Sequence, residues 1–474
     1  ANDIAGYRTV IGSSGADVVT FTSPSTMSVE AVETLIGSSG TDHVSTTGPS
    51  GATMLVSLIE NLNGGAGLDH ILMGSSGGTM SVSAVESLTG NLGTDVVTLD
   101  AAGNTIAVSM VESVEGGAGK DVVTGFGGGT FVVSQLETLI GGSGTNVVTS
   151  TGTGGSTMLV GGIATLAGGT GIDDITLSSS GNTITIGGVE NLQGGTGTDA
   201  LTVATGGATF AISLIETLTG STATDAVTST GTLGTTLSVT AIETLIGDIG
   251  TDIVTLASSS GNTITVALLE TLAGGAGQDV AQFLDGHDTT LLAVGLETLI
   301  GGTGTEIVAL TSSGTTTTVS QIEYLQGGAG TDIVALAAAT TLSVTMVETV
   351  AGSAGTDVIN GTGTLGSTLS VSAVETIIGA GDKDVVTLTG NGNTVTVSLL
   401  ETILGSGGKD VVLATSSSGN TFVIDAVESV TGGAGTDIVT ASGTNGNTLA
   451  IEKIETFFGS SGTDVVTLAD GGNT

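Results

Sequence analysis

Short apolar runs separated by glycine-rich turns recur along the whole chain. Three kinds of run alternate, represented by Asp-Val-Val-Thr-Leu at 95–99, Asn-Thr-Ile-Thr-Val at 262–266 and Val-Glu-Thr-Leu at 32–35. Their apolar residues are mostly β-branched and alternate with polar ones, and the 3.6-residue period of a helix is absent. The pattern therefore predicts about three short β-strands in each repeat and no helix.

An acidic residue at the start of one run defines the repeat. It recurs 18 times at spacings of 25 to 27 residues, from Asp17 to Asp464, and only Asn146 and Glu306 depart from aspartate. A constant period of this size is the signature of a repeat architecture. We therefore interpret residues 1–474 as a single continuous domain of 18 repeats.

A second acidic position lies nine residues before each of these residues. It runs from Glu33 to Glu455, and only Arg8 and Ala164 interrupt it. The residue four after this position is glycine in all 18 copies, which indicates a positive φ angle or a close backbone approach. The residues one before and two after it are apolar in every copy, so we assign these positions to the core.

No single repeat of this size can bury its own apolar face. Stacked repeats bury a continuous core and align equivalent residues into ladders. The sequence therefore predicts an all-β fold, a right-handed parallel β-solenoid (β-roll or β-helix) of about 18 coils, one per repeat, with no helical domain.

The composition limits the kinds of ligand that the chain can bind. Five Lys and Arg residues face 45 Asp and Glu residues, so the formal net charge is −40. Nucleic-acid and anionic-membrane binding both require clustered basic residues, and no apolar run is long enough to insert into a membrane. The chain has no cysteine, which excludes disulfides, thiolate metal sites and cysteine nucleophiles. An acidic chain of this kind attracts cations.

The glycine-rich turns resemble a known calcium-binding motif. The segments Gly64–Asp69, Gly116–Asp121 and Gly432–Asp437 each read Gly-Gly-Ala-Gly-x-Asp. They are similar to the nonapeptide of the RTX (repeats-in-toxin, haemolysin-type calcium-binding) family. This resemblance implies a parallel β-roll with Ca²⁺ between stacked turns, in a protein secreted to the cell surface or beyond, in many cases by type I secretion. Here only one turn per repeat matches, and many copies read Gly-Ser-Ser-Gly instead.

The negative charge of the aspartate series also favours the binding of a cation. If one residue of each coil stacked on the next, the carboxylates would lie about 5 Å apart, with a repulsion of about 1 kcal/mol per pair in water and 3–4 kcal/mol at an effective dielectric constant of 20. Ca²⁺ suits such a ladder because it accepts six to eight oxygen ligands in irregular geometry. The alternative is that each aspartate caps its own turn. The candidate metal ligands are Asp17, Asp42, Asp69, Asp95, Asp121, Asp173, Asp199, Asp225, Asp252, Asp279, Asp332, Asp357, Asp384, Asp410, Asp437 and Asp464.

Other patterns leave alternatives open. The glutamate series forms a solvated acidic edge, a second row of cations, or carboxyl groups that share protons. The threonine three residues after the aspartate, as in Thr20 and Thr98, predicts an outward polar ladder that could bind ice, polysaccharide or a neighbouring rod. No Ser/His/Asp grouping or histidine cluster stands out from the repeats, so we expect no enzymatic activity.

These observations lead to one expectation for function. We expect a secreted, calcium-stabilised structural rod of a bacterial surface or extracellular matrix, whose partners are further copies joined end to end. Both ends of the sequence fall inside the repeat, and Arg8 would lie between two glutamates where one copy meets the next. The alternatives are the stalk of a giant adhesin or surface-layer protein, and a threonine-ladder module with a lateral partner rod or surface polysaccharide.

Overall fold

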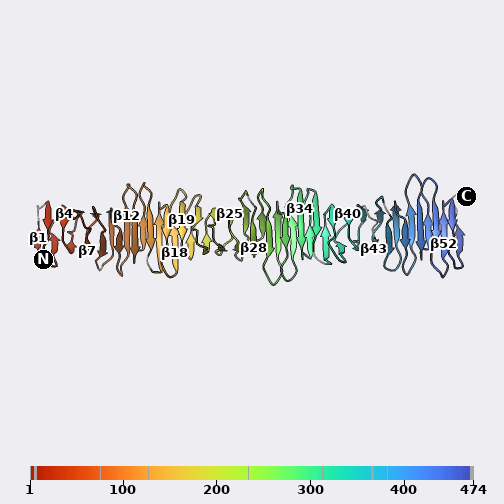
Figure 1. Cartoon of the computed structure of the whole chain (residues 1–474), viewed down its shortest axis with the longest axis horizontal. Helices are drawn as coiled ribbons and strands as arrows, with labels where there is room; N and C mark the ends of the chain where they lie inside the picture. Colours follow the sequence, from red (N-terminus) through yellow and green to blue (C-terminus); the bar gives the residue numbers. More distant parts are fainter. Residues whose placement is uncertain are drawn as a thin grey trace. The chain divides into compact units, whose positions relative to one another are not determined.

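The computed structural model describes residues 2–4, 8–74, 76–125, 127–232, 234–311, 314–363, 368–381 and 383–469. The chain divides into two compact units, Ala1–Gly231 and Thr232–Thr474. Each unit is built from short parallel β-strands stacked side by side, and the described residues contain no helix (Figure 1). The expectation of an all-β parallel solenoid is therefore confirmed.

Each sequence repeat contributes three strands, as the alternating pattern predicts. In the second unit, one repeat forms β48 (Val411–Ala414), β49 (Thr421–Asp425) and β50 (Ser429–Thr431). We call these the Asp strand, the middle strand and the Glu strand, because the first follows the repeat's aspartate and the third follows a glutamate. The next repeat begins with another Asp strand, β51 (Ile438–Ala441).

Each coil of the solenoid contains two strands rather than three. Strand β49 pairs in parallel with β47 (Thr402–Leu404) and with β51, and β50 pairs with β48 and with β52 (Thr448–Glu452). Odd-numbered strands therefore form one sheet of a unit and even-numbered strands form the other.

The prediction of about 18 coils is consequently wrong. The described residues form 54 strands, which make 27 two-stranded rungs and about 26 turns from the first rung to the last. The sequence repeat spans one and a half coils, because it supplies three strands to a coil that holds two.

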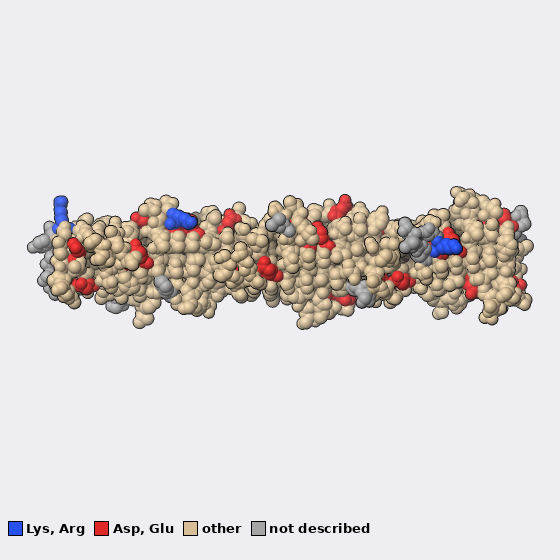
Figure 2. All heavy atoms as spheres, in the orientation of Figure 1, with Lys and Arg blue, Asp and Glu red and all other residues tan. Residues whose placement is uncertain are grey.

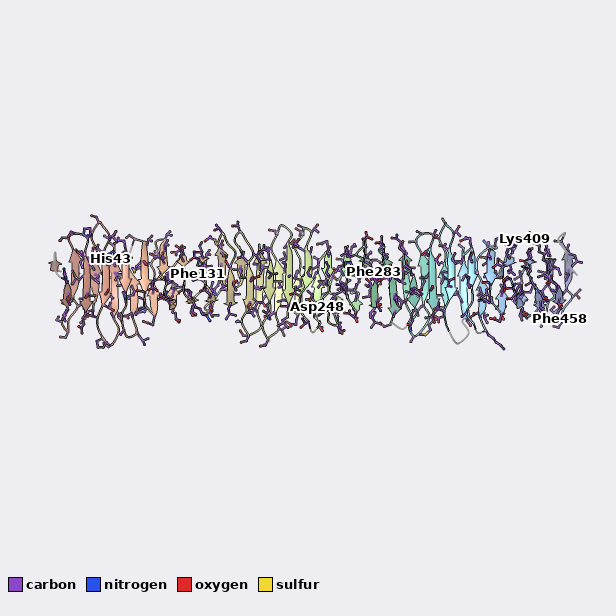
Figure 3. All side chains as sticks on the ribbon, turned by 90° about the horizontal axis from the view of Figure 1, so that it is seen from above. His43, Phe131, Asp248, Phe283, Lys409 and Phe458 are labelled. Atoms are coloured by element: carbon purple, nitrogen blue, oxygen red, sulfur yellow. The ribbon has the colours of Figure 1, made fainter. Side chains whose placement is uncertain are left out.

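The core lies between the two sheets of each unit. Along an Asp strand such as β12 (Asp95–Leu99), side chains alternate between buried and partly exposed positions, as expected where successive residues point to opposite faces. Buried aromatic side chains such as Phe131 and Phe283 fill the interior beside branched aliphatic ones (Figure 3). The apolar positions assigned to the core from the sequence, such as Val32 and Leu35, are buried.

The invariant glycine is explained by a close backbone approach. Between the middle strand and the Glu strand, the chain turns through a residue in the left-handed region, such as Ala426 with φ 53°. The carbonyl oxygen of this residue points at the invariant glycine of the preceding repeat, and a Cβ atom on Gly405 would lie 1.8 Å from the Ala426 oxygen. Any side chain would collide with the neighbouring backbone.

Two glycines of one turn provide a test of this packing. We expect Gly405→Ala to destabilise the adjacent coils by about 1–3 kcal/mol or more, because the backbone must shift to admit the methyl group. A Cβ atom on Gly407 would meet nothing within 4 Å, so Gly407→Ala should stay within about 0.5 kcal/mol of the parent. Urea unfolding with hydrogen exchange across β47–β50 measures both, and equal effects of the two substitutions would contradict the explanation.

Candidate functional site

The aspartates of successive repeats lie on opposite edges of the solenoid. Asp410 precedes the even-numbered strand β48, whereas Asp437 precedes the odd-numbered strand β51. Aspartates that share an edge within a unit are therefore two repeats and three rungs apart, about 14 Å at the usual strand spacing. The ladder of carboxylates about 5 Å apart does not form, because consecutive repeats alternate between the two edges.

Asp437 illustrates how these carboxylates are held. Its side chain is fully buried. Its Oδ2 accepts a hydrogen bond of 2.8 Å from the backbone N–H of Gly433, in the same turn. Its Oδ1 accepts bonds of 2.7 Å from both the backbone N–H and the side-chain amide of Asn420, in the preceding coil. The carboxylate thus closes its own turn and joins it to the coil before.

The same contacts recur along both units. Oδ2 accepts from the backbone N–H four residues earlier at 15 of the aspartates, over distances of 2.5–2.8 Å. Oδ1 accepts from the backbone N–H 17 residues earlier at 12 of them, over 2.7–3.0 Å. Fourteen of the 16 side chains are buried, and Asp17 and Asp464 are partly exposed.

The glutamate series completes the connection to the following coil. The backbone N–H of Asp437 donates to Oε2 of Glu455 over 2.7 Å. Fifteen such bonds of 2.7–2.9 Å link a residue of the aspartate series to the glutamate 16 to 18 residues later. We call each such pair a joint. The glutamates of these 15 pairs are partly exposed or exposed, as an acidic edge requires, but one oxygen of each is used by the backbone.

Two departures from the acidic pattern meet at one joint. Asn146 replaces the aspartate, and the residue in the glutamate position of the next coil is Ala164. Asn146 is fully buried and donates its side-chain amide to the carbonyl oxygens of Gly142 and Gly162. The acid is therefore absent on both sides of this joint, and a neutral amide fills the position of the carboxylate.

Local contacts change the pKa of two aspartates in opposite directions. Burial raises the pKa of Asp69, although the backbone N–H of Ala52 opposes the shift. At this turn Asn63 binds the N–H of Gly65, and Oδ2 of Asp69 has no partner. The side-chain amide of Asn447 lowers the pKa of Asp464, because it donates to the charged form.

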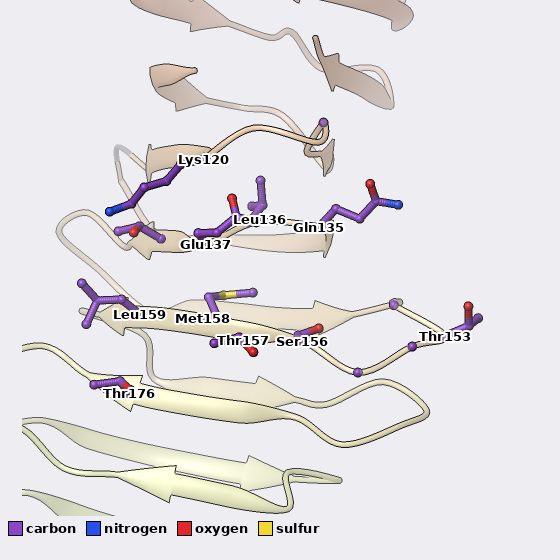
Figure 4. Close-up of a pocket in the computed structure, with 15 residues that line it drawn as sticks. Lys120, Gln135, Leu136, Glu137, Thr153, Ser156, Thr157, Met158, Leu159 and Thr176 are labelled. Carbon is purple, nitrogen blue, oxygen red and sulfur yellow. The ribbon is translucent and has the colours of Figure 1, made fainter. Parts of the chain in front are cut away.

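A shallow groove runs beside the glutamate of some joints. Two of these grooves hold about 810 Å³ at Glu137 and about 820 Å³ at Glu323, and smaller ones lie beside Glu86 and Glu60. Figure 4 shows the first of these, where Lys120, Glu137 and Leu159 line the space. The grooves repeat with the fold, beside equivalent glutamates of different repeats.

The contacts of the aspartates favour the capping alternative over a calcium ladder. Most of their carboxylate oxygens already accept N–H groups, and neighbours on one edge lie too far apart to share an ion whose ligands sit at 2.3–2.6 Å. Among the residues that the structure describes, no three His, Asp or Glu side chains form a group that could hold a metal. Calcium binding by this chain stays a prediction.

The threonine ladder is also interrupted. Thr98 does point outward, but its neighbours across the sheet are Ser81 and Glu115. The threonines of this series alternate between the two sheets, like the aspartates that precede them. Within one sheet they recur on every third rung, so this series forms no continuous ladder of threonines.

Comparison with known proteins identifies no relative. No protein-family model matches the chain, and no curated protein or solved structure matches it significantly. The resemblance to the RTX family therefore rests on the turn residues alone and stays a prediction. In the described part of the chain, no helix could span a membrane.

Sequence reasoning missed two classes of residue in the joints. One is the left-handed residue that faces the invariant glycine; it is Gly at 162, 188 and 295, and these three glycines were the available signal. The other is the asparagine that donates to the aspartate of the next coil. Six asparagines stand 17 residues before an aspartate, namely Asn104, Asn182, Asn262, Asn393, Asn420 and Asn447.

The capping role predicts a graded loss of stability. Asp437→Ala leaves three N–H donors of Gly433 and Asn420 without an acceptor, so we expect a loss on the order of 3 kcal/mol or more. Asn420→Ala removes one donor and keeps the carboxylate, so it should cost about 1 kcal/mol. Hydrogen exchange of β49–β51 measures both variants, and unchanged protection in Asp437→Ala would refute the role.

Proposed function

We propose that this chain is a structural repeat protein, which serves as a secreted spacer or scaffold at a bacterial surface or in an extracellular matrix and has no catalytic activity. The observation that carries the proposal is the use of the acidic residues. Of the 45 acids, 33 occupy the aspartate and glutamate series, and their contacts join one coil to the next. Because these acidic residues bond one coil to the next in both units, they favour a mechanical role for the chain over catalysis at a single site.

The surfaces of the units support the same proposal. Within each unit the visible face is mostly uncharged, and acidic side chains form separate spots (Figure 2). The outward positions of the strands are mainly Thr, Ser, Val and Ala, as in β46 (Thr394–Ser398) and β40 (Thr341–Thr345). A repeated surface without a distinct cleft suits a protein that spans a distance. Assembly of copies end to end, and use as an adhesin or surface-layer stalk, are forms of this role.

A spacer should tolerate a change of length by whole repeats. We expect deletion of residues 411–437, which joins Asp410 to Ile438, to leave a folded chain, because every repeat is equivalent on both edges. Deletion of residues 411–427 removes one whole coil but joins Asp410 to Glu428, so the order of Asp, middle and Glu strands is broken. Circular dichroism, thermal melting and small-angle scattering compare the two.

The comparison discriminates between the repeat and the coil as the building block. The 27-residue deletion should keep the melting temperature and shorten the particle, whereas the 17-residue deletion should lower the melting temperature. Loss of folding in the whole-repeat deletion would count against a modular spacer. Equal tolerance of both deletions would show that strand order is unimportant.

The capping contacts lead to the opposite expectation from the calcium ligation predicted by the sequence, and an experiment can distinguish the two. Metal that binds only the folded state would raise the melting temperature. Because the aspartate oxygens already accept N–H groups, we expect EGTA at constant ionic strength to leave the melting temperature unchanged, with no heat of Ca²⁺ binding in calorimetry. A fall in the melting temperature that Ca²⁺ restores and Na⁺ does not would instead establish calcium as a stabilising ligand.

A further inference from the structure

One joint of the second unit differs from all the others that the structure describes. Glu306 stands in the aspartate series, at the start of β36 (Glu306–Leu310), and its longer side chain is fully buried. Neither of its carboxylate oxygens has a hydrogen-bond partner. Every other acid of this series except Asp17 and Asp464 is also buried, but those aspartates are held by backbone N–H groups.

The donors that would hold an aspartate are used differently here. The backbone N–H of Thr289, 17 residues earlier, donates to the carbonyl oxygen of Thr305 over 3.0 Å. The hydroxyl of Thr289 is buried and has no partner. The N–H of Thr305 donates to Asp288 over 2.8 Å. The carboxyl of Glu306 therefore accepts no hydrogen bond from the N–H of Thr289, one of the two backbone N–H groups that hold an aspartate at other joints.

Negative groups surround this carboxyl on both sides. Glu323 precedes β38 (Tyr324–Gln326) and accepts the N–H of Glu306 over 2.9 Å, so the two glutamates belong to one joint. Asp288 precedes β34 (Thr289–Val294) on the other side. The same loop also carries Asp285 and His287, while the strands β34 and β38 themselves present no carboxyl or basic group. An ionised Glu306 would therefore be buried among like charges.

We propose that Glu306 makes the joint between β34, β36 and β38 sensitive to pH, so that these coils pack firmly when its carboxyl is protonated and loosen when it is ionised. A protonated carboxyl carries no charge into the core. It can also donate to the carboxylate of Glu323, which turns a repulsive pair into a hydrogen-bonded one. The proposal concerns this joint alone and does not depend on the proposed role as a spacer.

The protonation equilibrium fits this behaviour. Burial raises the pKa of Glu306 to about 7, and the nearby carboxyl of Glu323 and the charge of Asp288 add to the shift. The backbone of Gly302 opposes it in part. Because the pKa in the folded state is raised above the ordinary value of 4.5, the contribution to stability is complete below about pH 4.5 and is lost as the pH rises through about 7.

Hydrogen exchange of the full chain at pH 5 and pH 8 tests the proposal, after correction for intrinsic exchange rates. In the parent protein, we expect the amides of β34, β36 and β38 to lose on the order of tenfold or more of their protection at pH 8. The amides around the Asp357–Glu375 joint provide the reference, because this joint lies in the same unit and has the usual contacts. Equal protection at both pH values in β34–β38 would overturn the proposal.

Two variants assign the response to Glu306. Glu306→Gln cannot ionise, so its protection should not depend on pH; a response that persisted would come from His287 or another group and would overturn the proposal. Glu306→Asp restores the length found at the other joints, so it should be well protected at both pH values. If Glu306→Gln is unprotected at both pH values, Glu306→Asp decides the test. Loss of protection at pH 8 in Glu306→Asp, as in the parent protein, would refute the proposal.

Discussion

The fold depends on a buried carboxylate that accepts backbone N–H groups from two coils at once. A turn between short strands leaves N–H groups without partners, and burying them unpaired would cost about 1–3 kcal/mol each. Asp437 satisfies the N–H of Gly433 in its own turn and that of Asn420 in the coil before, while its own N–H binds Glu455 in the coil after. One acidic residue therefore connects three successive rungs.

This use of acids explains how a chain with a net charge of −40 can stack. The three-strand repeat is wound onto a two-strand coil, so consecutive aspartates fall on opposite edges and those on one edge are spread over three rungs. Repulsion between aspartates is thereby reduced, although each joint still brings an aspartate and a glutamate of adjacent coils together. Where the pattern changes, the joint loses the charge, as at Asn146 with Ala164, or the N–H contact to the coil before, as at Glu306 with Glu323.

Backbone geometry imposes a second constraint on the same corners. In the described repeats, the residue two before the glutamate position takes a left-handed conformation, even where it is Leu58 or Met110, at a cost of about 1–2 kcal/mol per residue. Its carbonyl then approaches the invariant glycine of the preceding repeat so closely that no Cβ atom fits. The glycine is thus required by a neighbour from the next repeat, while its own φ angle is ordinary.

The sequence alone determined the strands, the core and the repeat, because alternating apolar residues and glycine turns act locally. Val32, Leu35 and most of the other described apolar positions of the repeat are buried as their pattern predicted, and exceptions such as Val466 lie in the terminal coils. Only the tertiary structure decided the coil, since the number of strands per turn depends on which strands pair, and a 26-residue period is compatible with several windings. The 17-residue spacing from Asn420 to Asp437 carried that information, but its meaning depends on knowing that the two residues lie in adjacent coils. The sequence singled out the aspartates as candidate calcium ligands, which stays a prediction, whereas their partners, backbone N–H groups of other coils, became evident only from the pairing of the strands.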